Sequence, residues 1–231
     1  MCKIKVISFD IFQTLVDVNK RIPNIWKVIL KEEYTDELAE FGAKSLMSLY
    51  TKAIQLIVQD GNHFITMKDI FMDCAKTMVR ETDMAVNPEL VVDQLFLNHG
   101  KAPYYDDVWE TLDYIKRYYR VILSSDSSHT MADPIIDKVK PEYAFISDDL
   151  HCYKGEKKGR FFTIVADKLQ VPVEAILHIG DSNSDIIGAK EAGARAVLLN
   201  RVGRQWTSTI QPNYEIGSLK ELISMINLMP E

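Results

Sequence analysis

Four segments of this chain place residues that could do chemistry directly after runs of apolar residues. In the first, the β-branched run from Ile4 to Phe9 ends at Asp10, and Thr14 follows four residues later. The composition of the run predicts a buried strand, and an Asp at the carboxyl end of such a strand lies where open α/β folds bind ligands. Many strands end in Asp because it favours turns, so this segment alone leaves both interpretations open.

Three further segments repeat the pattern in order along the chain. Two serines follow the run 120–123, which is apolar after Arg120, and a lysine follows the strand-like run 143–147. Gly-Asp follows the run 175–179, with a second Asp four residues on. Strands of this kind, if parallel, bring their carboxyl ends to one edge of a sheet. The side chains expected there are Asp10, Thr14, Ser124, Ser125, Lys154, Asp181 and Asp185.

These residue types suit a phosphoryl group bound together with a hard divalent cation. A phosphate monoester is a dianion, which repels a carboxylate nucleophile. Mg²⁺ takes oxygen ligands and typically uses one or two protein carboxylates with water and substrate oxygens. Asp10, Asp181 and Asp185 are therefore candidate ligands, and the cation of Lys154 keeps clustered carboxylates ionised.

The ordered set of Asp, Ser, Lys and Asp-x-x-x-Asp resembles the haloacid dehalogenase (HAD) superfamily of hydrolases. Its most specific part is Gly180-Asp181-x-x-x-Asp185 followed by Gly188-Ala189-x-x-Ala192-Gly193, and the resemblance covers the chain apart from about 17–100. It implies that Asp10 attacks a phosphoryl group to form an aspartyl-phosphate, which water then hydrolyses.

The resemblance also assigns the other site residues. Thr14, Ser124 and Lys154 would hold the phosphoryl group. Mg²⁺ would be the cofactor. Its ligands would be Asp10, Asp181, Asp185 and the backbone carbonyl of Phe12. The candidates for substrate contact are Phe12, Gln13, Ser125, Lys20 and Arg21.

Two positions depart from the family pattern. Phe12 stands where phosphatase members usually carry a second Asp, which protonates the leaving group and later activates water. Phe12 cannot transfer protons, and general acid–base catalysis typically contributes about 10²–10⁴-fold. Gln13 stands where Gly is common in the family.

Three functions therefore remain open. The favoured one is a Mg²⁺-dependent phosphatase of a small phosphorylated metabolite. An aromatic residue at position 12 resembles the dehalogenase branch, so the alternative is a 2-haloacid dehalogenase that uses Asp10 without metal, although that branch lacks the intact Gly-Asp-x-x-x-Asp site. The third is a catalytically weak phosphate-binding or regulatory module.

The hydrophobic pattern predicts two domains. Residues 17–100 show helical spacing, with expected helices at 25–30, 38–58 and 70–78 and one that begins at Pro88 after Asn87 as N-cap. This insertion resembles a type 1 helical cap that closes over the active site; the alternative is a helical decoration with no gating role. Residues 1–16 and 101–231 would form the Rossmann-like α/β core, a parallel sheet with helices on both faces.

Within the core, strands and helices are expected to alternate. We expect helices over 106–119, 131–139 (with Pro134 in its first turn), 159–169, 183–192 and 219–226, and strands at 144–146, 176–179, 196–199 and 213–216. His178 is interpreted as a residue of the core or sheet face, and His99 as a loop residue.

Composition limits the class of protein. Against 33 Asp and Glu stand 27 Lys and Arg, a net charge of −6, which argues against binding to nucleic acid or to an anionic membrane. No apolar run approaches the roughly 18 residues of a membrane helix, and no signal peptide precedes the first strand. The three cysteines form no Cys-x-x-Cys pair, as in proteins of a reducing cytosol. We expect a cytoplasmic enzyme with a small-molecule substrate; the oligomeric state is not predicted.

Overall fold

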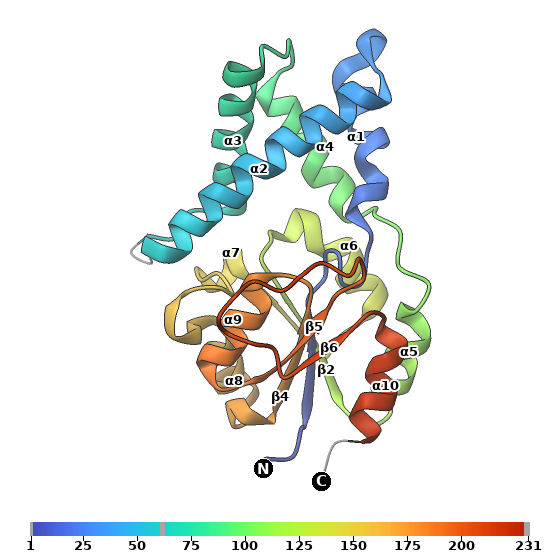
Figure 1. Cartoon of the computed structure of the whole chain (residues 1–231), viewed down its shortest axis with the longest axis vertical. Coiled ribbons are helices and arrows are strands. Elements are labelled where there is room, and N and C mark those ends of the chain that lie inside the picture. The colour runs from blue at the N-terminus through green and yellow to red at the C-terminus, as the bar shows by residue number, and fades with distance from the viewer. Residues whose placement is uncertain (1, 61–62, 229–231) are drawn as a thin grey trace.

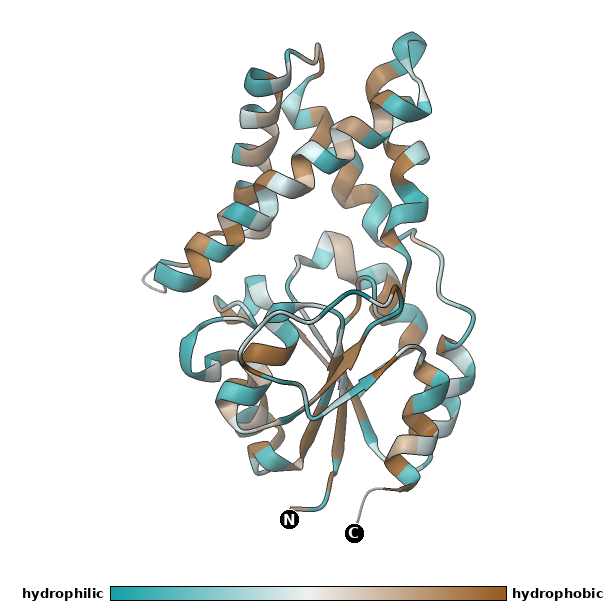
Figure 2. Ribbon diagram, viewed as in Figure 1, coloured by the Kyte–Doolittle hydropathy of each residue, from teal (hydrophilic) through white to brown (hydrophobic). Residues whose placement is uncertain are grey.

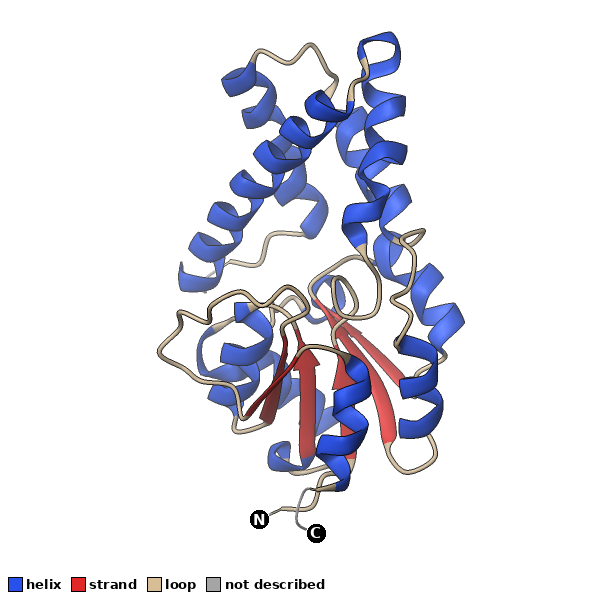
Figure 3. Cartoon of the chain, turned by 45° about the vertical axis from the view of Figure 1, so that its right-hand side comes forward, coloured by secondary structure: helices blue, strands red, loops and turns tan. Residues whose placement is uncertain are grey.

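A six-stranded parallel sheet forms the core of the protein (Figures 1 and 3). The structure, a computed structural model, describes residues 2–60 and 63–228. The strands are β1 (Val6–Phe9), β2 (Arg120–Ser125), β3 (Tyr143–Ile146), β4 (Ile176–Gly180), β5 (Arg195–Leu199) and β6 (Tyr214–Ile216), in the spatial order β3-β2-β1-β4-β5-β6. The predicted Rossmann-like sheet is confirmed.

Helices cover both faces of this sheet because successive side chains of each strand point to opposite faces. Ile7 and Phe9 of β1 pack with α5 (Val108–Ile115), α6 (His129–Val139) and α10 (Leu219–Asn227). Val6, on the other face, packs with α8 (Arg160–Leu169) and α9 (Asn183–Ala192). Figure 2 shows the resulting apolar strands between helices whose outer faces are polar.

A separate helical layer stands over the carboxyl ends of the strands (Figure 1). The short helix η1 (Val18–Arg21) leads out of the core into α1 (Ile22–Leu30), η2 (Lys31–Glu33), α2 (Asp36–Asp60), α3 (Met67–Thr82) and α4 (Pro88–His99). These helices pack around an apolar cluster that includes Trp26, Phe71 and Val92 and that also contains Met131 and Tyr153 of the core domain. Asn87 caps α4 by accepting a hydrogen bond from the Leu90 backbone N–H, as the sequence predicts. The inserted helical cap is thus present.

Several element boundaries differ from expectation. Helix α5 covers only Val108–Ile115 because the residues on either side form turns. Pro134 lies inside α6 rather than in its first turn, since the helix begins at His129. The Pro134 ring lies against Gly100, where an added Cβ would come within 2.5 Å of it. The interior proline of α6 therefore packs against Gly100, the residue that follows α4.

Short one-turn helices complete the chain: α7 (Ser147–Leu150), η3 (Lys157–Gly159) and η4 (Val173–Ala175). Among the described residues, no helix combines the length and the apolar character that crossing a membrane requires.

Candidate active site

The strand order reverses at the centre of the sheet, and the candidate site lies at that point. From β1 the chain continues to β2 and β3 on one side, whereas β4, β5 and β6 lie on the other. Phe9 pairs with Leu123 of β2 and with Ile179 of β4. The next residues, Asp10, Ser124 and Gly180, are therefore neighbours at the carboxyl edge. Open α/β sheets bind ligands in the crevice at such a switch point.

Lys154 is the cation of this site. Its Nζ lies 2.6 Å from Asp10 Oδ1 and 2.5 Å from Asp185 Oδ1, and the side chain is 2% exposed. The backbone around Lys154 fits closely against α9, because an added Cβ at Gly188 would come within 1.8 Å of the Lys154 carbonyl oxygen. The glycine of the motif thus admits the lysine segment to the sheet edge, and Lys154, rather than Lys157 or Lys158, contacts the nucleophile candidate.

Asp185 is fixed by a buried network that the sequence did not reveal. Its Oδ1 accepts a hydrogen bond from His178 Nε2 at 2.9 Å. The Nδ1 of His178 lies 2.9 Å from Ser8 Oγ, which donates to Ser124 Oγ at 2.9 Å. Ser124 therefore belongs to a chain of hydrogen bonds behind the site.

Asp181 completes a group of three carboxylates. One oxygen from each of Asp10, Asp181 and Asp185 lies within 4.8 Å of the others. Asp181 Oδ2 also pairs with Arg204 Nη2 at 3.1 Å, and the same guanidinium donates to the Asp181 carbonyl. At Asp185, both the Ser182 hydroxyl and the Ser182 backbone N–H donate to Oδ2, at 2.5 and 3.0 Å, which closes the first turn of α9.

The proximity of these groups shifts their pKa values. Burial raises the pKa of Asp10 to about 8, although Lys154 opposes the shift and the neighbouring carboxylates increase it. Burial likewise raises the pKa of Asp181 to about 6, with help from Asp185 and against Arg204. At Asp185 burial opposes ionisation, but Lys154 and His178 outweigh it and lower the pKa. The site holds more negative than positive charge.

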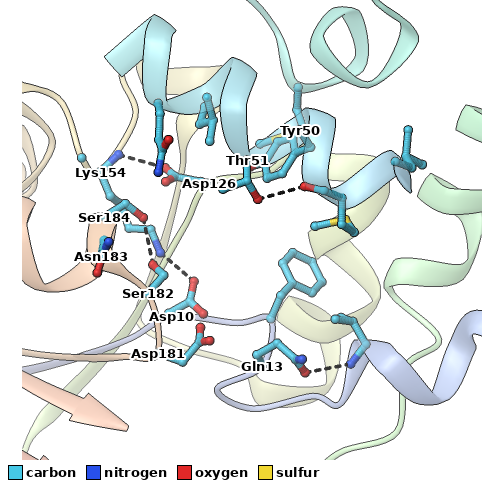
Figure 4. Close-up of a pocket in the computed structure, with 18 of the residues that line it drawn as sticks. Asp10, Gln13, Tyr50, Thr51, Asp126, Lys154, Asp181, Ser182, Asn183 and Ser184 are labelled. Atoms are coloured by element: carbon cyan, nitrogen blue, oxygen red, sulfur yellow. Dashed lines mark hydrogen bonds and ion pairs between the residues drawn. The ribbon is translucent and has the colours of Figure 1, made fainter. Parts of the chain in front are cut away.

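Asp126 adds a fourth carboxylate. Its Oδ1 accepts a hydrogen bond from the Lys154 backbone N–H at 2.9 Å, and burial raises its pKa to about 6. Figure 4 shows Asp10, Asp126 and Asp181 around the Lys154 segment, with Tyr50 and Thr51 of α2 on the opposite wall. The sequence predicts no functional residue in α2, because no spacing rule distinguishes the few helical residues that face a ligand.

A cavity of about 950 Å³ lies between the core and the cap. Its core wall includes Asp10, Lys154 and Asp181, whereas the cap contributes mainly apolar side chains. Those apolar residues are Val18, Ile22, Ile25, Trp26, Ala43, Leu46, Met47, Tyr50, Ile54, Val58, Met67, Phe71, Val91 and Leu95. Cavities of this size commonly hold organic ligands with a few precisely placed polar contacts.

Among the expected substrate contacts, Phe12, Gln13 and Arg21 line the cavity. Gln13 has φ +64°, which explains why a glycine would suit this position, and its Oε1 accepts hydrogen bonds from the Val18 N–H and the Tyr105 hydroxyl. Lys20 lies outside the cavity wall. Its side chain is 69% exposed and its Nζ lies 3.9 Å from Asp17, so Lys20 takes no part in the proposed site.

The hydroxyl residues are buried. Thr14 Oγ1 and Ser125 Oγ have no hydrogen-bond partner among the described residues, and neither residue belongs to the cavity wall. Buried hydroxyls normally have partners, so these two oxygens keep unused hydrogen-bonding capacity next to the site.

The prediction for His99 was wrong. It is the last residue of α4 rather than a loop residue, and it is buried in the cavity wall. His99 Nε2 lies 3.0 Å from Arg21 Nη2, and the His99 ring meets the Phe12 ring edge-on at 4.7 Å. Phe12 of the core and Arg21 at the start of the cap thus both contact His99 at the end of the cap, which no local pattern could show.

Comparisons with known proteins agree with this architecture. Residues 4–193 match the family model of haloacid dehalogenase-like hydrolases. A search of curated proteins gave no match to the sequence.

Solved structures share the fold at low identity. A dehalogenase has 19% identity and a TM-score of 0.79, over 97% of this chain and 98% of that one. An L-2-haloacid dehalogenase from Xanthobacter autotrophicus with chloropropionic acid covalently bound has 14% identity and a TM-score of 0.82, over 98% and 100%. YfnB from Bacillus subtilis bound to magnesium has 16% identity and a TM-score of 0.80, over 98% and 100%.

Proposed function

Because the chain belongs to the haloacid dehalogenase-like hydrolases, we propose that it is a Mg²⁺-dependent phosphatase of small organic phosphomonoesters. The observation that carries the proposal is the cluster of Asp10, Asp181 and Asp185, whose oxygens lie within 4.8 Å of one another at the sheet edge.

The charge of the site supports a divalent cation. Three carboxylates (Asp10, Asp126 and Asp185) act on the cation of Lys154, and a fourth, Asp181, pairs with Arg204. Two negative charges are therefore left over when all four carboxylates are ionised, and like charges at this distance are costly in a buried site.

The donor set also fits Mg²⁺. Carboxylate and carbonyl oxygens are its preferred ligands, at about 2.0–2.1 Å, so opposite ligands lie about 4 Å apart. The observed spread of up to 4.8 Å needs only a small inward movement. Asp10, Asp181, Asp185 and the Phe12 carbonyl would hold the ion. When bound, Mg²⁺ would neutralise charge on the phosphoryl oxygens.

The chain's own residues would carry the reaction. An Asp10 carboxylate oxygen attacks phosphorus and the bond from phosphorus to the ester oxygen breaks. The aspartyl-phosphate forms, and the departing alkoxide takes a proton from water. Water then attacks that phosphorus and returns Asp10 and inorganic phosphate. Lys154 holds the phosphoryl oxygens and orients Asp10, while the free hydroxyl of Thr14 is a further donor. We propose that residues 17–100 close over the site and exclude bulk water.

A dehalogenase is the second candidate, favoured by Phe12. This residue supplies no acid for an alkoxide leaving group, and halide needs none. Two of the similar structures described above are dehalogenases. The deciding experiment measures turnover of a phosphomonoester panel and of 2-chloropropionate, each with Mg²⁺ and with EDTA. Mg²⁺-dependent phosphate release supports the phosphatase; halide release unaffected by EDTA contradicts it; turnover of neither class supports the binding module.

The metal site predicts a thermal shift. A ligand at a hundred times its Kd stabilises the folded state by about 2.7 kcal/mol, which for a chain of this length raises Tm by about 5–10 °C. We expect 10 mM Mg²⁺ to give such a shift in the wild-type protein and none in Asp181→Ala, by differential scanning fluorimetry. Arg204→Ala is the matched control, since it removes the partner of Asp181 but keeps the ligand. A full shift in Asp181→Ala would contradict the site.

Phe12 predicts a preference among leaving groups. Esters whose alcohol has a low pKa depart without protonation, so aryl and acyl phosphates should react faster than sugar phosphates. Phe12→Asp should raise alkyl-ester hydrolysis by about 10-fold or more, as general acid catalysis contributes about 10²–10⁴-fold when well placed. Steady-state rates on both ester classes in both proteins test this, and the aryl rates control for disturbance of the Phe12–His99 contact. Equal alkyl and aryl rates in the wild-type protein would show that another group delivers the proton.

A further inference from the structure

Arg21 is a buried cation with no acidic partner among the described residues. Its side chain lines the cavity, and the residue is 7% exposed. The guanidinium makes one hydrogen bond in the described structure, to His99 Nε2 at 3.0 Å, and its Nε is buried without a partner. Burial is what lowers its pKa, to about 9. Uncompensated burial of a cation is costly, so structures seldom keep one without a counter-charge.

Arg201 of the same chain shows what a structural arginine looks like. Its Nη1 and Nη2 each lie 2.9 Å from one oxygen of Asp107, and Nη2 also donates to the Thr14 carbonyl at 3.0 Å. Arg201 is thus held by a bidentate carboxylate, which is the strongest arrangement for a guanidinium. Arg21 has no equivalent, although its planar fork is suited to the same kind of oxyanion.

His99 positions the guanidinium without neutralising it. An arginine only donates, so His99 Nε2 must be the acceptor, and the His99 Nδ1–H then donates to the Leu95 carbonyl at 3.0 Å. This tautomer is neutral, in agreement with the pKa of His99, which burial and Arg21 lower well below its usual value. The imidazole therefore fixes one edge of Arg21 and leaves its charge available.

The residues that line the cavity around Arg21 indicate the chemical character of its ligand. Ile22 follows Arg21 directly, and Leu95 lies one helical turn before His99. Both are apolar parts of the same cavity, whose core wall carries Asp10 and Lys154 (Figure 4). Arg21 and Asp10 line the same cavity, and the Phe12 ring, two residues after Asp10, contacts the His99 ring that holds Arg21. A volume of about 950 Å³ exceeds what a phosphate group alone needs.

We propose that Arg21, held by His99, binds a second oxyanion of the substrate, a carboxylate or a second phosphate at the far end of an apolar body from the phosphoryl group that reaches Asp10. The inference rests on the proposed function, which it deepens by naming the substrate class. It goes beyond the reacting centre, because Arg21 touches a part of the substrate that does not react.

Three matched substrates test it. Aryl phosphates built on one phenol, with a three-carbon side chain that ends in a carboxylate, a phosphate or a primary amide, share a leaving group and differ only at the far end. In the wild-type protein, kcat/KM for the carboxylate or the phosphate should exceed that for the amide by at least 10-fold, mainly through KM. The anion with the larger increase in kcat/KM over the amide identifies whether Arg21 binds a carboxylate or a phosphate. In Arg21→Met that ratio should fall to about 1.

Lys20→Met is the matched control, because it removes the same charge from the neighbouring exposed position and should keep the ratio. Equal kcat/KM for anion and amide in the wild-type protein would overturn the proposal while the phosphatase stands. If Arg21→Met lowers kcat/KM for the amide as much as for the anion, or lowers the Tm of the ligand-free protein, Arg21 is structural and the proposal fails.

Direct binding separates this inference from the proposed function. 3-Phenylpropanoate carries the oxyanion and the apolar body without a phosphoryl group, and calorimetry can measure its binding to the whole protein without turnover. Binding to wild type and Lys20→Met that is at least 10-fold weaker in Arg21→Met supports the subsite even if no phosphomonoester is hydrolysed. Equal binding to all three proteins, or none to the wild type, overturns it.

Discussion

Asp10→Asn should lower phosphomonoester hydrolysis by about 10³-fold or more while the fold survives. The substitution keeps the shape of the side chain and its contact with Lys154 but removes the nucleophilic oxygen, and loss of a nucleophile removes the covalent path altogether. The measurement is single-turnover release of phosphate under saturating Mg²⁺. A correctly folded Asp10→Asn protein with near-normal turnover would rule out covalent catalysis by this residue.

The same variant should change the pH dependence of stability. Burial raises the pKa of Asp10 from 3.8 to about 8, so between these values the folded state holds the proton that the unfolded state has lost. Asp10 therefore makes the free energy of unfolding fall as pH rises from about 4 to 8. Asp10→Asn removes this contribution, and in EDTA it should be at least as stable as wild type at pH 8. Urea unfolding at pH 5 and pH 8 measures the difference.

The edge of the sheet could be predicted from sequence because strand ends are local signals. Asp10, Ser124 and Asp181 each follow a short apolar run, and alternation of strands with helices implies a parallel sheet that aligns those ends. The helix of Asp-x-x-x-Asp was equally accessible, since Ser182 and Asp185 form a capping box at its start. At these residues, the local sequence pattern is enough to predict the position in the fold.

The partners of those residues could not be predicted in the same way. His178 donates to Asp185 through the interior of the sheet, and Ser8 joins it to Ser124 on the neighbouring strand. Arg204 lies in an irregular segment more than twenty residues beyond Asp181. A buried histidine in a strand looks like a core residue, and an arginine in a loop looks like a surface residue, until the topology brings each one to a carboxylate.

Contacts between residues far apart in the sequence also explain why the helices of the cap could be predicted but their contacts could not. Helical spacing identifies α2 and α4, but it does not say which of their side chains face the core. Arg21 and His99 lie 78 positions apart and meet at the boundary between the two domains. The family resemblance placed Arg21 near the site and the local sequence placed His99 in a loop. Only their contact shows that they form one unit.

Lys154→Met should lower both the free energy of unfolding and the rate of hydrolysis. Lys154 lies between Asp10 and Asp185, at 2.6 and 2.5 Å, and is almost wholly buried. Removal of one partner from a buried ion pair typically costs about 3–5 kcal/mol because the remaining charge is uncompensated. The rate should also fall by about 10²–10³-fold, as for loss of one fixed donor to a developing charge. Lys158→Met, an exposed change in the same segment, should leave stability nearly unchanged.

The loss of stability in Lys154→Met should depend on pH with a definite sign. Lys154 lowers the pKa of Asp185 in the folded protein, so the stability that Asp185 contributes is present above its unfolded pKa of about 4 and disappears as pH falls through the lowered value. In EDTA, the difference in the free energy of unfolding between wild type and Lys154→Met should be largest at pH 7. It should shrink as pH falls below about 4, where Asp185 is protonated both in the unfolded chain and in the variant. Urea unfolding of both proteins at pH 7 and pH 3.5 measures it. A difference of the same size at both values would mean that Lys154 stabilises the fold by packing rather than by its charge.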